Sequence, residues 1–266
     1  MWRVGCWVAI ACLVGLPLTA MAQPVPTIAV ASSLRFVLEP LAERFEEQSG
    51  ASVRLSFGSS GNLRRQIAQG APYELFLSAN EAYVDALVEA GLTEGDGVRY
   101  ARGRLVWLQP ETASAGEPLP EEDAPLAAVT ESVRRFTDTG ELARIAIANP
   151  EHAPYGVAAR QTLKHAGLWE DVQPLLVRGE SVAQAAQFAL SGDTRGGLVA
   201  YSLALAPELE ERSDYVLIPE SWHAPLHQRM VLLPGAKQTA HAFYDFLQSE
   251  PARVILAKFG FAVPGE

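Results

Sequence analysis

Short apolar segments that suit buried strands alternate with segments of helical periodicity along most of this chain. Residues 27–31 (TIAVA) form the first apolar segment, and residues 34–50 follow with apolar side chains at helical spacing and a final glycine. The same succession returns at 52–57, 62–70, 73–79 and 81–92. Because parallel strands need a crossover connection, usually a helix, this alternation predicts an α/β architecture with a largely parallel sheet.

The alternation is interrupted once, after an apolar segment at 104–110. Residues 111–125 are rich in proline, glycine and acidic side chains and are expected to form a loop, after which the α/β pattern resumes. A chain of 266 residues can form one or two domains. Two apolar strands, at 104–109 and 228–233, suit a pair of crossings between two α/β lobes.

The N-terminal 22 residues predict the cellular location of the protein. Arg3 is followed by an apolar run from Val4 to Leu18, and Ala20 and Ala22 occupy the small-residue positions of a cleavage site. This pattern is typical of a secretory signal peptide cleaved after Ala22. The apolar run is shorter than the roughly 20 residues that a membrane-spanning helix needs. The protein is therefore expected to be periplasmic.

Cysteine content and charge exclude several classes of function. Both cysteines, Cys6 and Cys12, lie in the predicted signal peptide, so the mature chain has no disulfide framework, thiol nucleophile or cysteine metal site. The formal net charge of −10 becomes about −11 once Arg3 is removed. An acidic protein of this kind is a poor candidate for nucleic-acid binding, which depends on phosphate neutralisation by lysine and arginine.

Two predicted strand-to-helix turns carry paired serines. Residues 31–34 read ASSL and residues 57–62 read FGSSGN. A helix N-terminus presents free backbone N–H groups and a partial positive charge, and serine hydroxyls add donors, so such turns suit an anion. The alternative is that the serines only cap their helices. Two further helix starts, near Tyr155 and near Val182, follow predicted strands in the same way.

Catalytic and metal-binding alternatives have weaker support. FGSSGN is not a G-x-S-x-G motif, and the chain has no Walker or G-x-G-x-x-G sequence. An exported serine hydrolase with Ser60 or Ser33 as nucleophile would need a base, and His152 is the only plausible one. His223 and His227 could hold a metal, but a proline between them argues against the helix that would align them.

Four segments resemble a known family in order and spacing. They are IAVASSL at 28–34, LSFGSSGNLRRQIAQGAPYELFLSAN at 55–80, IAIANPEHAPYGVAARQTL at 145–163 and GLVAYS at 197–202. They resemble the periplasmic molybdate-binding protein of the molybdate ABC transporter. The resemblance implies a two-lobed type II periplasmic-binding-protein fold, in which each lobe is a mixed, mostly parallel sheet flanked by helices. The lobes are joined by two crossing strands. The expected lobes are 23–106 with 228–266, and 107–227.

The resemblance also implies the function. It predicts a binding protein, not an enzyme, that captures molybdate or tungstate in the interlobe cleft by hinge closure. The protein would then deliver the oxyanion to an ABC permease. It is expected to be monomeric and to need no cofactor. Molybdenum would be bound only as the oxyanion. The matching positions imply hydroxyl contacts from Ser33, Ser60 and Tyr201 and backbone N–H contacts from Tyr155 and Val182. Ser32 and Ser59 are additional candidates.

These donors suit a proton-free oxyanion. Molybdate at neutral pH is a tetrahedral dianion whose oxygens only accept hydrogen bonds, and hydroxyl and N–H groups supply donors for it. Phosphate usually carries a proton and needs an acceptor, which the matched positions lack, so it should be rejected. Sulfate is also an acceptor-only dianion, and a binding protein for sulfate or another oxyanion therefore stays open as an alternative.

Overall fold

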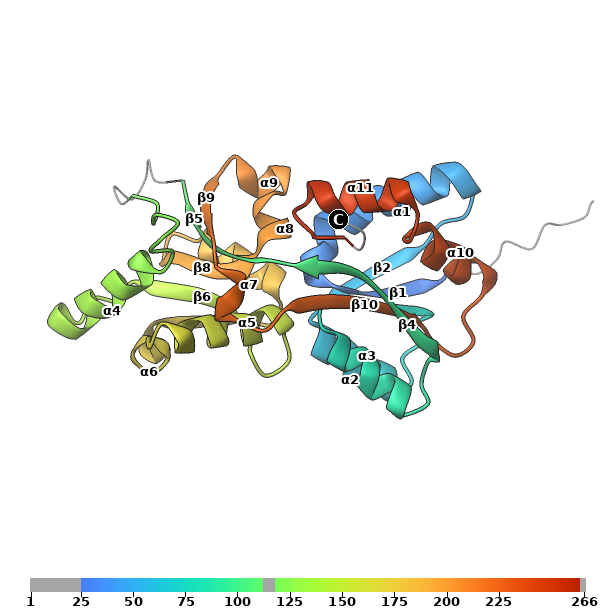
Figure 1. Ribbon diagram of the computed structural model, residues 1–266, viewed down its shortest axis with the longest axis horizontal. Coiled ribbons are helices and arrows are strands. Elements are labelled where there is room, and N and C mark those ends of the chain that lie inside the picture. Colours follow the sequence, from blue (N-terminus) through green and yellow to red (C-terminus); the bar gives the residue numbers. More distant parts are fainter. Residues whose placement is uncertain (1–24, 112–117, 264–266) are drawn as a thin grey trace, which may run out of the picture.

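The computed structural model describes residues 25–111 and 118–263, and it contains two sheets of five strands each, in two lobes (Figure 1). The predicted signal peptide lies outside the described residues. Within those residues, no helix is both long and apolar enough to span a bilayer.

The first lobe has the strand order β2-β1-β3-β10-β4. Strands β1, β2 and β3 are parallel, whereas β10 runs antiparallel to both β3 and β4. The strands are β1 (Thr27–Ala31), β2 (Arg54–Gly58), β3 (Leu75–Ser78), β4 (Glu94–Gly103) and β10 (Leu226–Leu232). The helices are α1 (Arg35–Ser49), α2 (Ser60–Ala68), α3 (Glu81–Glu89), α10 (Gln238–Phe246) and α11 (Glu250–Lys258).

The second lobe repeats this plan with the order β7-β6-β8-β5-β9. Strands β6, β7 and β8 are parallel, and β5 is antiparallel to β8 and β9. The strands are β5 (Leu105–Pro110), β6 (Arg144–Ala148), β7 (Leu176–Gly179), β8 (Thr194–Ala200) and β9 (Ser213–Leu217). The helices are α4 (Ala127–Thr139), α5 (Pro154–His165), α6 (Trp169–Val172), α7 (Val182–Ala189), α8 (Tyr201–Ala204) and α9 (Pro207–Glu210).

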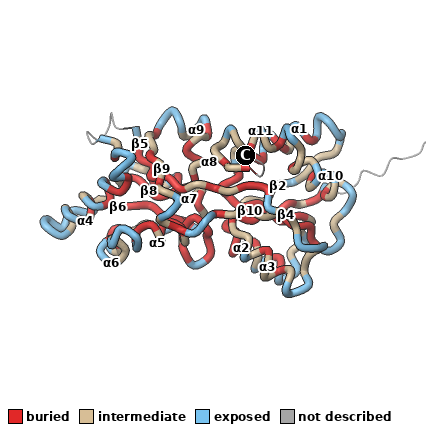
Figure 2. Tube along the Cα trace, in the orientation of Figure 1, coloured by how far each residue is buried: buried red, intermediate tan, exposed pale blue. Residues whose placement is uncertain are grey.

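Buried apolar side chains account for the central strands of both sheets. Strands β1 and β6 are buried almost throughout, as expected for strands covered on both faces by helices. Burial is greatest along the middle of the molecule and decreases toward the outer helices (Figure 2). The fold therefore confirms the predicted class: two lobes, each with a mixed sheet flanked by helices.

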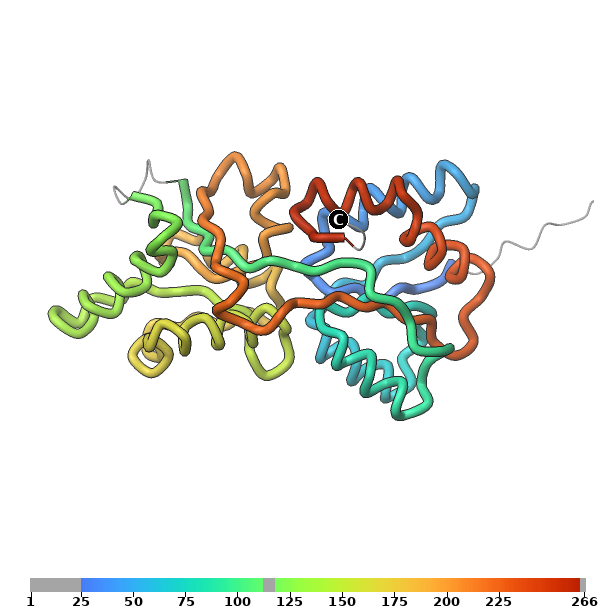
Figure 3. The backbone as a smooth tube through the Cα atoms, viewed as in Figure 1, coloured from blue at the N-terminus to red at the C-terminus, as the bar shows by residue number. Residues whose placement is uncertain are grey.

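The chain passes between the lobes twice (Figure 3). Strand β4 belongs to the first sheet and ends at Gly103, whereas β5 begins at Leu105 in the second sheet, so the first crossing is at Arg104. The second crossing lies between β9 and β10, before Leu226. Both crossings therefore lie slightly earlier in the chain than the boundaries expected after residues 106 and 227.

Candidate functional site

A small cavity lies between the lobes at the carboxyl ends of parallel strands. In each lobe two strands lead into helix starts there: β1 into a 3₁₀ turn (Ser32–Leu34) and β2 into α2 in the first, β6 into α5 and β7 into α7 in the second. Open α/β sheets bind ligands at this end of the strands. The unfilled space is about 190 Å³. Its lining residues are Ala31, Ser32, Ser33, Gly58, Ser59, Ser60, Ala79, Ala153, Pro154, Tyr155 and Val182.

The first lobe contributes four buried serines to this lining. The Ser60 hydroxyl oxygen accepts a hydrogen bond of 3.0 Å from the Ala79 N–H, so its own hydrogen stays available. The Ser32 hydroxyl oxygen accepts a longer bond of 3.4 Å from the Ala183 N–H across the lobes. The Ser33 hydroxyl oxygen is buried and makes no hydrogen bond of good geometry among the described residues, although it lies close enough to the Tyr155 hydroxyl to interact with it. A buried polar atom of this kind is costly unless a partner satisfies it.

The second lobe contributes backbone N–H groups at helix starts. Tyr155 follows Pro154 in the first turn of α5, and Val182 is the first residue of α7, which Ser181 caps by accepting from the Gln184 N–H at 3.3 Å. N–H groups in the first turn of a helix have no partner within that helix. Both N–H groups are therefore placed as donors at a positive helix end.

The side chain of Tyr155 extends to the crossing between the lobes. The Gln228 amide donates to its hydroxyl oxygen at 3.3 Å, and the Tyr100 hydroxyl donates to the same amide's oxygen at 3.0 Å. Burial raises the pKa of Tyr155 well above its ordinary value, so the phenol stays protonated. The Tyr155 hydroxyl therefore lies between Gln228 at the crossing and Ser33 in the cavity lining.

Tyr201 is not brought together with the other predicted site residues. Its hydroxyl lies 3.3 Å from the Tyr215 hydroxyl, and the two ring centroids are 5.2 Å apart. The Arg104 guanidinium lies 5.7 Å from the centroid of the Tyr201 ring. Because β8 ends at Ala200, Tyr201 is already the first residue of α8, and its ring is directed to Tyr215 instead of the cavity.

Direct contacts between the lobes surround the cavity. The Ser202 hydroxyl donates to the Ser33 carbonyl at 2.7 Å, and the Gly61 N–H donates to the His152 carbonyl at 2.9 Å. The His152 ring places Nδ1 2.9 Å from the Ser59 hydroxyl oxygen and Nε2 3.2 Å from a carboxylate oxygen of Glu180. Sequence reasoning considered His152 only as a hydrolase base and missed Glu180, whose partner is distant in the chain.

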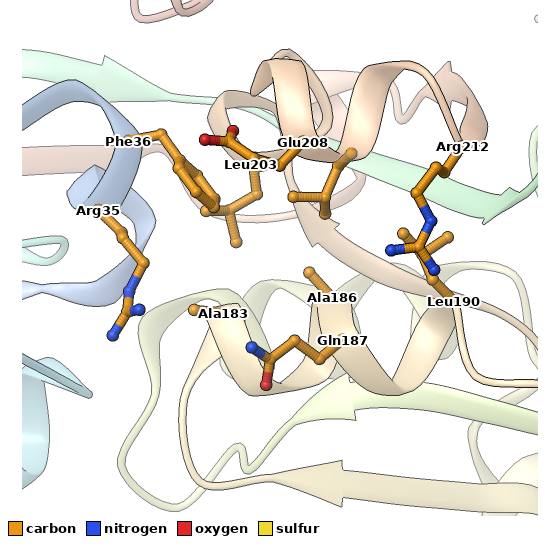
Figure 4. A pocket seen from close by; sticks show the side chains of 10 residues that line it. Arg35, Phe36, Ala183, Ala186, Gln187, Leu190, Leu203, Glu208 and Arg212 are labelled. Carbon is orange, nitrogen blue, oxygen red and sulfur yellow. The ribbon is translucent and has the colours of Figure 1, made fainter.

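A second, larger cavity also has residues of α7 in its lining. It has about 830 Å³ of unfilled space and includes apolar side chains of α7, α8 and α9, with Arg35, Glu208 and Arg212 at its margin (Figure 4). None of the predicted site residues lines it. No cluster of three or more histidine, cysteine, aspartate or glutamate side chains that could hold a metal ion occurs in residues 25–111 and 118–263.

Comparison with known proteins places this geometry in a family. The chain is 35% identical to a molybdate-binding protein, ModA, of Rhodobacter capsulatus over 95% of its own length and 94% of the relative's. It is 31% identical to the ModA of Azotobacter vinelandii, with 89% of each chain covered. The solved periplasmic molybdate-binding protein of Azotobacter vinelandii superposes with a TM-score of 0.77 over 90% of this chain and 99% of that one. These matches confirm the resemblance seen in the sequence.

More distant structures share the fold. A sulfate-binding protein, SubI, of Mycobacterium tuberculosis superposes with a TM-score of 0.67 at 16% identity, over 91% of this chain and 87% of that one, so its likeness extends to the fold alone. A family model described as bacterial extracellular solute-binding protein matches residues 26–262. With nearly the whole described chain inside that match, the protein belongs to the bacterial extracellular solute-binding protein family.

Proposed function

We propose that this protein is a periplasmic binding protein that captures molybdate, and tungstate equally well, and delivers it to an ABC permease. One observation carries the proposal: uncharged donors from both lobes converge on a cavity whose lining includes no lysine, arginine, aspartate or glutamate. The molybdate-binding proteins to which the chain is similar over most of its length support the choice of ligand.

The chemistry of the lining favours a fully deprotonated oxyanion. Hydroxyls of Ser33 and Ser60, with Ser32 beside them, and N–H groups of Tyr155 and Val182 can donate to ligand oxygens, and Ser59, which contacts His152, is an additional candidate. Helix N-termini add favourable electrostatics without a cationic side chain, and the distant acidic residues are screened beyond roughly 8–10 Å. Without a carboxylate acceptor, the site disfavours the protonated oxygen of phosphate.

Hinge closure follows from the division of donors between the lobes. A ligand that contacts both lobes binds the closed arrangement more tightly than an open one and therefore shifts the population toward closure. The closed lobes would present a defined surface to the permease. The binding protein would act as a monomer with no cofactor, and molybdenum would enter only as the oxyanion.

The hydrolase alternative fits the geometry less well. His152 contacts Ser59 and not Ser60 or Ser33, so the expected nucleophile and base are not paired. Ser59, His152 and Glu180 do resemble a nucleophile, a base and an orienting carboxylate. The cavity, however, has only about 10 Å³ of space for the centre of a water molecule, far below the roughly 300–1,000 Å³ typical of pockets for organic ligands.

Calorimetric titration of the mature protein with molybdate, tungstate, sulfate and phosphate tests the proposal. We expect molybdate and tungstate to bind with similar affinity, sulfate to bind less tightly because it is smaller, and phosphate to give no heat of binding. Ester substrates should remain unhydrolysed in a parallel assay. Tight phosphate binding, or no binding of either metal oxyanion, would refute the proposed function.

A further inference from the structure

His152 connects the two lobes at the edge of the small cavity. It lies in the connection between β6 and α5, and 7% of its surface is exposed. Its carbonyl accepts from the Gly61 N–H, and its Nδ1 lies 2.9 Å from the Ser59 hydroxyl oxygen. Both contacts are to the start of α2 in the opposite lobe. The ring therefore has a fixed position against one of the serines that line the cavity.

Glu180 determines which ring nitrogen carries hydrogen. Its carboxylate oxygen lies 3.2 Å from His152 Nε2. A carboxylate only accepts hydrogen bonds, so Nε2 must be the protonated nitrogen. In the neutral ring, Nδ1 then has a lone pair, and the Ser59 hydroxyl must donate its hydrogen to Nδ1. That hydrogen is consequently unavailable to a ligand.

Ser59 differs in this respect from two of its neighbours. The hydroxyl oxygens of Ser60 and Ser32 accept from backbone N–H groups, of Ala79 and Ala183, so their hydrogens are free to point at an oxyanion. When the His152 ring gains a proton, Nδ1–H donates to the Ser59 oxygen instead. The Ser59 hydrogen is released, and a positive charge appears beside the cavity.

From this geometry we infer that His152 is a positioning residue that controls whether Ser59 donates to the bound oxyanion. The inference rests on the proposed function. The dianion favours the protonated ring, so affinity should be higher at low pH and should fall as pH rises and the ring loses its proton.

Several charged groups lie around the ring. Glu180, on the connection between β7 and α7, contacts Nε2 with its carboxylate. Glu151, next to His152 in the chain, pairs with Arg160 of α5 at 3.7 Å. The cations of α2 are Arg64 and Arg65, and Arg65 bonds to Asn62. Of these groups within the described part of the chain, Glu180 is the one whose side chain contacts the His152 ring.

The test is molybdate affinity measured by calorimetry between pH 6 and 8, at micromolar concentrations where molybdate stays a monomeric dianion. The unmodified protein should bind about tenfold more tightly at pH 6 than at pH 8, the effect of one charge-assisted hydrogen bond. Ser59→Ala should reduce affinity about tenfold at pH 6 and change it little at pH 8. His152→Gln should abolish the pH dependence.

Two variants act as controls. His241, whose Nε2 lies 3.3 Å from a carboxylate oxygen of Glu94, repeats the histidine–glutamate pair outside the cavity, and His241→Gln should keep the full pH dependence. Glu180→Gln replaces an acceptor-only group with an amide that can also donate to Nε2, so the neutral ring can carry its hydrogen on Nδ1 and free Ser59, and the pH dependence should become weaker.

A flat profile for the unmodified protein, an unchanged profile in His152→Gln, or an equal loss at both pH values in Ser59→Ala would overturn the inference. Thermal denaturation of each variant shows whether it is folded. If His152→Gln does not fold, the pH profiles of the Ser59 and Glu180 variants test the inference instead. Molybdate binding without pH dependence would refute this inference alone, whereas no molybdate binding at any pH would refute the proposed function as well.

Discussion

The two lobes line the cavity with the same number of helix starts but with different donors. The first lobe provides serine hydroxyls at the starts of the 3₁₀ turn and α2, whereas the second provides backbone N–H groups at the starts of α5 and α7. A hydroxyl can be removed by one substitution, and its hydrogen can be redirected, as at Ser59. A backbone donor depends only on where its helix begins. The hydrogen-bond donors of the first lobe can therefore be removed by single side-chain substitutions, whereas those of the second lobe cannot.

The largest effect is expected where the lobes touch. A Cβ at Gly61 would lie 2.6 Å from the His152 carbonyl oxygen, so Gly61→Val should prevent full closure. We expect molybdate affinity to fall by about 100-fold or more, which corresponds to the upper end of the usual cost of overpacking. Calorimetry measures the loss, and small-angle scattering should show a more open molecule.

Gly192→Val is the matched control, because no atom lies within 4 Å of a Cβ placed there. Its affinity and scattering should match the unmodified protein. If Gly61→Val bound molybdate normally, the contact between α2 and the His152 loop would not be part of the binding-competent state.

A smaller loss is expected from a single hydroxyl of the first lobe. Ser60→Ala removes a donor to a buried dianion and should weaken binding by about 1.5–3 kcal/mol in calorimetry. It also leaves the Ala79 N–H without its partner, so thermal stability should fall by about 1–3 kcal/mol. Ser132→Ala, at a buried serine that bonds within α4, should leave binding unchanged. Full affinity in Ser60→Ala would show that Ser60 is not a ligand contact.

The smallest effect on binding is expected from a hydroxyl of the second lobe. Tyr201→Phe should change molybdate affinity by less than about twofold, because its hydroxyl faces Tyr215. The hydrogen bond with Tyr201, together with burial, raises the pKa of Tyr215 to about 12. In the variant this pKa should fall toward about 10, which an ultraviolet titration of tyrosinate measures. A tenfold loss of affinity would instead place the Tyr201 hydroxyl on the ligand.

The sequence predicted the parts of the fold whose signals are local. Apolar runs located β1 and β5, and helical spacing located α1 and α3. Strand β4 was missed because it is polar and rich in glycine: Gly97 has a positive φ, and a Cβ there would collide with the Met230 carbonyl of β10. The position of such a strand is determined by pairing with its neighbour β10 and not by the apolar pattern of its own sequence.

The candidate site was predictable to a similar extent. Helix-start signals at Ser33, Ser60, Tyr155 and Val182 are local, and the structure brings these residues to one cavity. The direction of Tyr201 depends on where β8 ends, because one residue along a strand reverses the face to which a side chain points. The contact of His152 with Ser59 joins residues 93 positions apart, so no local pattern could reveal it.

Tyr155 occupies two places at once, since its amide lies at the cavity while its phenol reaches the junction of the strands that link the lobes. Room for the phenol exists because Gly103 has no side chain there; a Cβ would collide with the tyrosine oxygen. If the lobes move about that junction, as the proposed hinge closure requires, the movement displaces a residue whose amide lies at the cavity. Under the proposed function, lobe movement and occupancy of the cavity would then be coupled through a single residue, Tyr155.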